Sequence, residues 1–402
     1  MHSLLSGNLM DVCPVGAITT RDYRFKSRPW DNPLAADTIC TFCSKGCNTT
    51  VWIKAKPEWA KGAVMARVTP RFNPEVNSYW MCDIGRFDYH WVESDRRLTQ
   101  PLVRATNGVQ QPVVWPDALR ALQTRLAATF DGAGSKSGLQ FLASAHASLE
   151  ELHLLKSLTA GIGSTLHITW TTSQKSQPAD AKFKVPVIDA PNVNGARDLG
   201  LVDKPVADLA GLRNAVEGGA VNALFVLDTG PAGSLGDVRW IIAARESGKL
   251  PLLVVEGVLQ SELTAAADFV LAGSSNFEKD GSFTNDQGRV QGAAAVAAAP
   301  GEALDDSLIL SRIGTMLGVE LPAPDRARTE IAKQLMHLEA YGALQQMVFS
   351  RPVAARTWLQ ASNPSERWKW DFLFQDLPPV KGTVDLLSLP YQPATIPLKK
   401  ID

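Results

Sequence analysis

The distribution of cysteine constrains this chain more than any other feature of its sequence. All five cysteines lie within the first 82 of its 402 residues, and Cys40, Cys43 and Cys47 form the pattern C-x2-C-x3-C. Cys82 follows after residues 48–81. A clustered set of odd number, in a chain without a signal-peptide pattern, favours metal ligation over a disulfide framework.

The spacing of the four later cysteines favours an iron-sulfur cluster. Three thiolates from one tight loop and a fourth from a separate segment are the usual ligands of a [4Fe-4S] cluster. Gly46 fits this interpretation, because glycine lets the backbone approach the inorganic sulfides. A structural zinc site usually carries two C-x2-C pairs, but Cys82 has no neighbouring cysteine. We expect a [4Fe-4S] cluster, with zinc or unligated thiols as alternatives, at Cys40, Cys43, Cys47 and Cys82.

Cys13 stands apart from the other cysteines, in the segment DVCPVGAIT. A Cys-Pro pair typically ends a ferredoxin-type motif whose other cysteines lie upstream. No cysteine precedes Cys13 in this chain. Two interpretations therefore remain open: Cys13 is a free, buried thiol, or it is the last ligand of a second cluster whose other ligands come from elsewhere.

Composition and charge exclude several classes of protein. A chain with 45% hydrophobic and 20% charged residues can bury a sizeable core in two or more domains, which excludes a disordered or fibrous protein. The formal net charge of -1 removes the electrostatic argument for a nucleic acid partner. No run approaches about 20 consecutive apolar residues. We expect no membrane span, and a soluble chain in the cytoplasm or on the cytoplasmic side of a membrane.

Apolar runs and helical patterns alternate in the middle of the chain. The runs have the continuous apolar character of strands buried on both faces of a sheet, and they lie at 139–144, 223–228 and 252–257. The helical patterns lie at 115–130, 148–163 and 238–247. This alternation predicts a parallel sheet with helices on both sides. Short alternating runs at 50–55 and 63–69 predict a small β-rich module before it.

Five segments in the first 104 residues resemble one known family in their order and spacing. They are SGNLMDVCPVGAIT, YRFKSRPW, TICTFCSKGC, RVTPRFNPEVNSYWMCDIGRFDYHW and RLTQPLVR. Together they resemble the G subunit of NADH-quinone oxidoreductase, which is the large iron-sulfur subunit of bacterial complex I. Residues 267–291, ADFVLAGSSNFEKDGSFTNDQGRVQ, are similar to a segment that this subunit shares with molybdopterin oxidoreductases.

The resemblance implies an iron-sulfur electron-transfer subunit of a complex I-like NADH:quinone oxidoreductase, with no independent substrate chemistry. It implies that Cys40, Cys43, Cys47 and Cys82 bind one [4Fe-4S] cluster, and that Cys13 matches the last ligand of a preceding ferredoxin-like cluster. The implied partners are the flavin-bearing and quinone-side subunits. The implied place is the cytoplasmic side of the inner membrane, as a peripheral part of the complex.

The resemblance also divides the chain into four parts. Residues 1–29 are expected to end a ferredoxin-like cluster domain, and 30–105 to form a [4Fe-4S] module of the type found in Mo/W bis-MGD enzymes. Residues 106–322 are expected to form a degenerate molybdopterin oxidoreductase-like parallel α/β domain. Residues 323–402 are expected to form a helix and an extended C-terminal tail.

Three departures from the family pattern bear on function. The ferredoxin-like N-terminal part is not in this sequence, Ile84 stands where the family commonly has lysine, and no cysteine after Cys82 can ligate molybdenum. These departures disfavour bound molybdopterin guanine dinucleotide. We therefore expect 278–291 to be a structural loop and Asp228–Gly233 to be an ordinary strand-to-helix turn.

Two other functions remain as alternatives. One is a molybdopterin- or tungstopterin-dependent oxidoreductase subunit similar to formate dehydrogenase. The other is a non-catalytic structural module whose fold is stabilised by the metal site.

Overall fold

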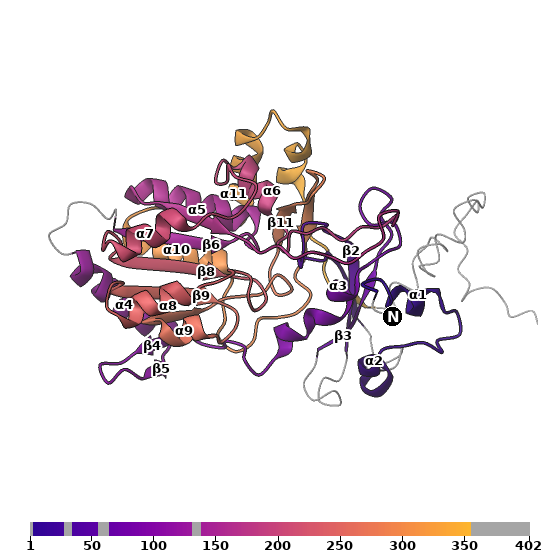
Figure 1. Cartoon of the computed structure of the whole chain (residues 1–402), viewed down its shortest axis with the longest axis horizontal. Helices are drawn as coiled ribbons and strands as arrows, with labels where there is room; N and C mark the ends of the chain where they lie inside the picture. The colour runs from indigo at the N-terminus through magenta and orange to yellow at the C-terminus, as the bar shows by residue number, and fades with distance from the viewer. Residues whose placement is uncertain (1–2, 28–33, 55–63, 131–137, 355–402) are drawn as a thin grey trace, which may run out of the picture.

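A computed structural model describes residues 3–27, 34–54, 64–130 and 138–354. Figure 1 shows a layered α/β unit on the left and a smaller unit on the right that holds the N-terminal segment and a small sheet. A two-stranded hairpin, β11 (Gly281–Thr284) with β12 (Val290–Ala293), lies between the two units. The expected β-rich module followed by an α/β domain is confirmed.

The small sheet is antiparallel and has the strand order β13-β1-β2-β3. Its strands are β1 (Leu34–Ile39), β2 (Asn48–Ile53), β3 (Met65–Pro70) and β13 (Val353–Ala354). Strands β2 and β3 confirm the alternating runs of the sequence. Strands β1 and β2 form a hairpin, and the cysteine-rich segment 40–47 is its turn. Before this sheet lie two short helices, α1 (Asn8–Val12) and α2 (Arg21–Lys26).

The large sheet has the order β5-β4-β10-β9-β8-β6-β7, and its neighbours from β10 to β7 are all parallel. The parallel strands are β6 (Leu139–Ser144), β7 (Leu166–Thr169), β8 (Ala223–Asp228), β9 (Leu252–Gly257) and β10 (Phe269–Ala272). At one edge β4 (Leu102–Arg104) and β5 (Gln110–Pro112) continue the sheet antiparallel. The predicted parallel sheet is therefore confirmed.

Helices cover both faces of this sheet. The helices of one core are α4 (Trp115–Phe130), α5 (Leu149–Ile162), α6 (Val193–Asp198), α10 (Asp306–Leu317) and α11 (Pro324–Gln334), and those of the other are α7 (Ala210–Glu217), α8 (Arg239–Glu246) and α9 (Glu262–Ala266). Phe141 and Phe225 face the first core, and their neighbours Leu142 and Val226 face the second. Successive side chains of a strand enter the two cores in turn, which explains why these strands have continuous apolar runs.

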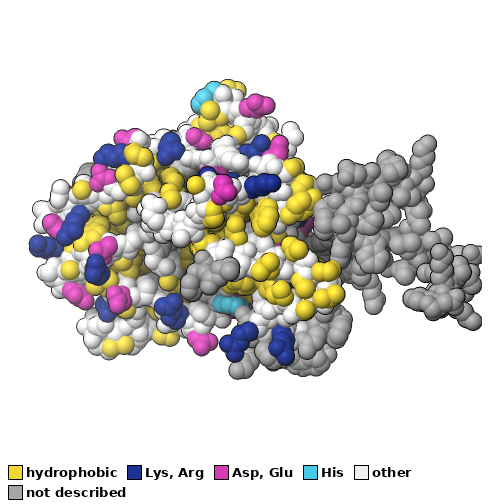
Figure 2. All heavy atoms as spheres, turned by 45° about the vertical axis from the view of Figure 1, so that its right-hand side comes forward, with side chains coloured by type: hydrophobic (Ala, Val, Ile, Leu, Met, Phe, Trp, Pro, Cys, Tyr) yellow, Lys and Arg dark blue, Asp and Glu magenta, His cyan; other side chains and the backbone are white. Residues whose placement is uncertain are grey.

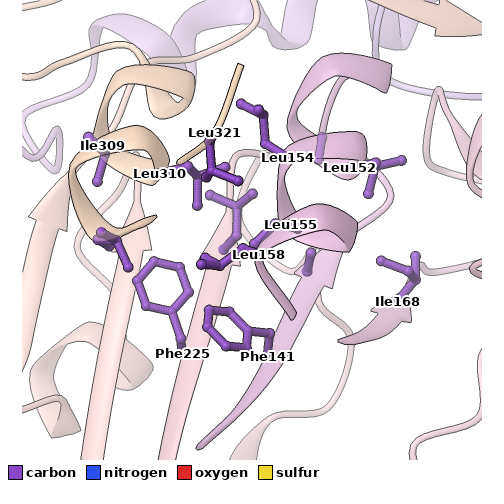
Figure 3. Close-up of a cluster of buried hydrophobic side chains, with 14 of the residues drawn as sticks. Phe141, Leu152, Leu154, Leu155, Leu158, Ile168, Phe225, Ile309, Leu310 and Leu321 are labelled. Carbon is purple, nitrogen blue, oxygen red and sulfur yellow. The ribbon is translucent and has the colours of Figure 1, made fainter. Parts of the chain in front are cut away.

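The first core is a close-packed aliphatic and aromatic cluster. In Figure 3, Phe141 and Phe225 project from the strands toward Leu155 and Leu158 of α5. The two phenylalanine rings lie 5.4 Å apart, centroid to centroid. Helix α5 begins at a capping box, in which the Ser148 side chain and the third helical residue satisfy each other's backbone N–H groups.

The domain boundary expected between residues 105 and 106 does not agree with the pairing of the strands. Strand β4 lies before that point, yet Val103 pairs with Phe269 in the large sheet. The connection starts still earlier, because Arg97 forms a bridge with Leu259. A hairpin that extends a sheet edge cannot be split between domains, so the large-sheet unit starts close to residue 97. The tail expected after α11 lies, from residue 355 on, outside the described residues.

The surface carries mixed charge. On the face shown in Figure 2, basic and acidic side chains are interspersed, and hydrophobic side chains gather toward the end that carries the small sheet. Exposed aromatic residues of that unit include Phe72, Tyr79 and Trp80. Across the described residues, no helix has the length and apolar character needed to cross a membrane.

Candidate metal centre

The C-x2-C-x3-C segment forms the tip of the β1–β2 hairpin. The N–H of Cys40 donates to the carbonyl oxygen of Cys47 at 2.8 Å, which closes the loop. Gly46 has a φ of 64°, a left-handed conformation that glycine adopts without strain. The closed loop places the thiols of Cys40, Cys43 and Cys47 within one turn of chain, all buried.

Cys82 reaches the same place from a separate segment. It caps the N-terminus of α3 (Asp83–Phe87) and is 4% exposed. A Cβ atom at Gly85 would lie 2.6 Å from Cys40 Sγ, so α3 packs directly on the cysteine loop. The segment before Cys82 is tied to the start of β2, because Asn77 Oδ1 accepts from the Asn48 N–H at 3.0 Å. The four predicted ligands thus lie in one buried group.

Burial raises the pKa of all four thiols, and neighbouring thiols raise it further for Cys40, Cys43 and Cys47. For Cys43, burial is the main cause and the Cys82 thiol adds to it, which raises the pKa to about 12. Burial raises the pKa of Cys40 and Cys47 well above the usual range, and neighbouring thiols of the group contribute. Burial also raises the pKa of Cys82. Four buried thiols with these properties are expected to ionise only when cations balance their charge.

The chemistry of this group fits an iron-sulfur cluster. The N–H of Phe42 donates to the Cys40 sulfur and that of Lys45 to the Cys43 sulfur. The N–H groups of residues 84 and 85, in the first turn of α3, donate to the Cys82 sulfur. The buried Ser44 hydroxyl has no hydrogen-bond partner among the described residues. Amide donors to sulfur and a spare polar group are the surroundings that such clusters use.

Within residues 3–27, 34–54, 64–130 and 138–354, no three or more His, Cys, Asp or Glu side chains are grouped so that they could hold a metal ion. A single zinc ion needs ligand atoms that lie close enough together to contact the same ion. A [4Fe-4S] cluster instead takes one thiolate on each of four iron atoms, so its ligands stand farther apart.

Cys13 is not part of the buried group. It follows the last residue of α1 and is partly exposed, so of the two interpretations that of a buried thiol is wrong. Backbone N–H groups of residues 15–18 surround the Cys13 sulfur and lower its pKa, with that of Ile18 contributing most.

The hairpin of β11 and β12 braces the cysteine loop. Gln291 Nε2 donates to the carbonyl oxygen of Gly46 at 3.0 Å and to Asn48 Oδ1 at 3.1 Å. The N–H of Asp286 donates to the carbonyl oxygen of Ser44 at 2.7 Å. The segment 278–291 thus makes structural contacts with the cysteine loop.

A buried charge network lies where the carboxyl end of β9 meets α5 and α10. Lys279 Nζ lies 2.6 Å from Glu151 Oε1 and also contacts an Asp306 carboxylate oxygen, and all three side chains are at most 1% exposed. Burial and the adjacent Asp306 hold the pKa of Glu256 well above its usual range. Among the described residues the Glu256 oxygens and Asp306 Oδ1 have no hydrogen-bond partner. We expect Glu256 to hold a proton, which it can donate to Asp306.

The segment after β8 is a strand-to-helix turn, as expected. The Ser234 hydroxyl donates to Asp228 Oδ1, and Gly233 has a φ of 88°. Burial raises the pKa of Asp228 to about 6. The turn closes on itself, because the N–H of Ser234 donates to the carbonyl oxygen of Pro231 at 3.0 Å.

Several residues that shape the site gave no signal in the sequence. Asn8 accepts from the N–H of Met81 at 3.1 Å and from Arg86 Nη2 at 3.1 Å, which joins the N-terminal segment to α3. Asn77 and Lys175 also act over long sequence separations. Single polar residues of this kind form no motif, so periodicity and spacing could not identify them.

The large-sheet unit matches the sequence model of a known protein family. The model of the family described as molybdopterin oxidoreductase matches residues 97–196 and 192–316, which together exceed half of the chain. The chain belongs to the molybdopterin oxidoreductase family. The match begins at Arg97, which forms an isolated bridge with Leu259 just beyond the end of β9.

Curated relatives are named as subunits of NADH-quinone oxidoreductase. The G subunit of this enzyme from Streptomyces coelicolor is 40% identical over 137 residues, which is 34% of this chain and 15% of that protein. Subunit 3 of the Thermus thermophilus enzyme is 34% identical over 168 residues, 42% of this chain and 19% of that protein. The mitochondrial NADH-ubiquinone oxidoreductase 78 kDa subunit of Candida albicans is 34% identical over 166 residues, which is 41% of this chain and 21% of that protein.

The matched region is thus about a fifth or less of each of these relatives. Among solved structures, acetylene hydratase from Pelobacter acetylenicus matches 78% of this chain and 72% of its own, with a TM-score of 0.46 and 11% identity.

Side chains of this chain occupy the space beside two glycines at the carboxyl ends of parallel strands. Ligands of open parallel sheets bind beyond the carboxyl ends of the strands. After β8, a Cβ atom at Gly230 would lie 2.5 Å from Ser234 Cβ and 2.8 Å from His146 Cγ. After β10, a Cβ atom at Gly273 would lie 2.2 Å from Asp306 Oδ1. The chain's own side chains fill these positions, and no cysteine follows Cys82.

Proposed function

We propose that the chain is an iron-sulfur electron-transfer subunit of a complex I-like NADH:quinone oxidoreductase. In this proposal Cys40, Cys43, Cys47 and Cys82 bind one [4Fe-4S] cluster. The observation that carries the proposal is the meeting of these four cysteines, from two separate segments, in one buried group with amide donors to three of the sulfurs.

A bound cluster would accept and release single electrons with little change of shape. The protein's own part is to hold four thiolates, exclude water and supply hydrogen bonds to sulfur. The N–H groups of Phe42 and Lys45 donate to two cysteine sulfurs of the loop, and N–H groups in the first turn of α3 donate to the Cys82 sulfur. Such donors stabilise the more negative, reduced state and thereby raise the potential.

Chemical analysis of anaerobically purified protein tests the proposal. We expect about four iron and four acid-labile sulfide per chain, with an EPR signal after reduction by dithionite. Cys43→Ser should lose most of the iron, whereas Cys13→Ser, the matched control, should keep it. One zinc per chain without sulfide would refute the cluster and support the structural module. Stoichiometric molybdenum or tungsten would support the pterin-dependent alternative.

The names of the relatives support partners within a respiratory complex. Relatives named as subunits of NADH-quinone oxidoreductase suggest that the chain assembles with flavin-bearing and quinone-side subunits, at the cytoplasmic side of the inner membrane. Affinity purification of the tagged chain from its native cells should recover NADH dehydrogenase activity. Recovery of the chain alone, under conditions that keep such complexes intact, would contradict this assignment.

For Cys13 we propose ligation of a second cluster whose other ligands lie outside this chain. Its partial exposure and the amide groups of residues 15–18 support this role, because they leave a thiolate accessible and stabilised. In the purified complex, Cys13→Ser should remove one cluster signal while the signal of the four-cysteine site persists. An unchanged EPR spectrum of the complex would refute it.

A further inference from the structure

The loop that follows β7 brings a second segment against the cysteine site. Residues 171–189 leave the large sheet and return antiparallel to themselves. Phe183 and Val185 of this loop belong to the apolar cluster that contains three of the four cysteines. The returning stretch also contacts the cysteine loop directly, since the N–H of Ser44 donates to the carbonyl oxygen of Ile188 at 3.2 Å.

This loop carries an ion pair between a buried lysine side chain and a partly exposed aspartate. The Lys175 side chain is 7% exposed, and its Nζ donates to Asp189 Oδ1 at 2.5 Å and to the Ser173 hydroxyl. Asp189 directly follows Ile188, whose carbonyl oxygen accepts from the Ser44 N–H, so the ion pair lies beside the cysteine loop. The ammonium group is thus a positive charge next to the metal centre, fixed in place by its two partners.

We propose that Lys175, held by Asp189 and Ser173, raises the reduction potential of the cluster bound by the four cysteines. This inference rests on the proposed function. Reduction by one electron from an external donor adds a negative charge at the site and makes or breaks no covalent bond. A fixed cation nearby stabilises the more negative state. Asp189 has the opposite effect, so the two members of the pair should shift the potential in opposite directions.

Burial makes Lys175 different from other lysines of the same loop. Lys182 and Lys184 flank the buried Phe183, but neither of them is buried. Water and salt screen charges at the surface, so their effect on the site should be small. A unit charge on the order of 10 Å away, at an effective dielectric constant of about 20, changes an equilibrium constant roughly tenfold. For a one-electron couple a tenfold change corresponds to about 59 mV.

Potentiometric titration followed by EPR tests this proposal on the 402-residue chain with its cluster reconstituted. Lys175→Met should shift the potential to more negative values by roughly 59 mV, and Asp189→Asn should shift it to more positive values. The double variant should lie between the two. Lys175→Arg keeps the charge and should restore most of the native potential. Lys184→Met, the matched control, should leave the potential unchanged.

The outcomes separate this inference from the function on which it rests. If the native chain binds a cluster and the two single variants shift its potential in opposite directions, the charge of Lys175 sets the potential. Shifts in the same direction, or no shift, would overturn the inference and leave the cluster in place. A native chain that takes up no iron and sulfide would overturn both.

Discussion

Replacing Lys279 by methionine is expected to destabilise the large-sheet unit by about 3–5 kcal/mol, the usual cost of breaking a buried ion pair. Lys279 Nζ lies 2.6 Å from Glu151 Oε1 and also contacts Asp306. At an effective dielectric constant of about 20, a contact of that length is worth about 6 kcal/mol of attraction. In the native protein, the cost of removing the ammonium group from water offsets part of this attraction.

The loss should depend on pH. Burial raises the pKa of Glu151 and Asp306 in the native protein, and Lys279 lowers both. Without Lys279 the two pKa values rise further, so the folded variant holds protons that the unfolded chain releases above about pH 4. A folded state that binds more protons loses stability as pH rises. The penalty should therefore be small near the ordinary carboxyl pKa and grow toward the raised pKa of the folded variant.

Urea unfolding of the native chain and the variant, at about pH 5 and about pH 8, measures this difference. The matched control is Lys204→Met, which removes a lysine from the exposed pair with Asp208 and should change stability little at either pH. A loss for Lys279→Met below about 1 kcal/mol at the higher pH would refute the assigned role of Lys279. So would a loss of equal size at both pH values.

Three further substitutions test the site and its supports. Glu256→Gln should cost less than about 1 kcal/mol in urea unfolding, because an amide N–H can replace the carboxyl proton shared with Asp306; a large loss would mean that Glu256 is ionised. Gly85→Ala should lower the iron content, because its Cβ would lie 2.6 Å from Cys40 Sγ, whereas Gly211→Ala, with open space around its Cβ, should not. Gln291→Ala should speed the release of iron to a chelator, whereas the exposed control Gln287→Ala should leave that rate unchanged.

The sequence predicted the large sheet well because its signals are local. Strands β6, β8 and β9 match the apolar runs residue for residue, since most side chains of these strands enter one of two cores. The shorter strands β7 and β10 escaped notice. Each has four residues, too few to stand out from the apolar segments around them.

Local signals also explain what was predicted of the metal centre. Cysteine spacing identified four residues that the fold gathers, because a tight loop must keep Cys40, Cys43 and Cys47 together. Contacts between distant segments gave no such signal. Asn77 reaches Asn48 across 29 positions, and Gln291 reaches Gly46 across 245. Only the folded chain shows these supports.

The segment from Glu278 to Gln291 joins the two units through a series of buried contacts. Glu278 pairs with Arg97 at 2.6 Å, and the next residue, Lys279, neutralises two carboxylates of the large-sheet unit. Gln291, at the other end, holds the cysteine loop. Moving either end would leave buried charges or polar groups unpaired, at a cost of several kcal/mol. These contacts hold the cysteine loop against the large-sheet unit and involve no cysteine sulfur, so removal of a cluster should leave the large sheet intact.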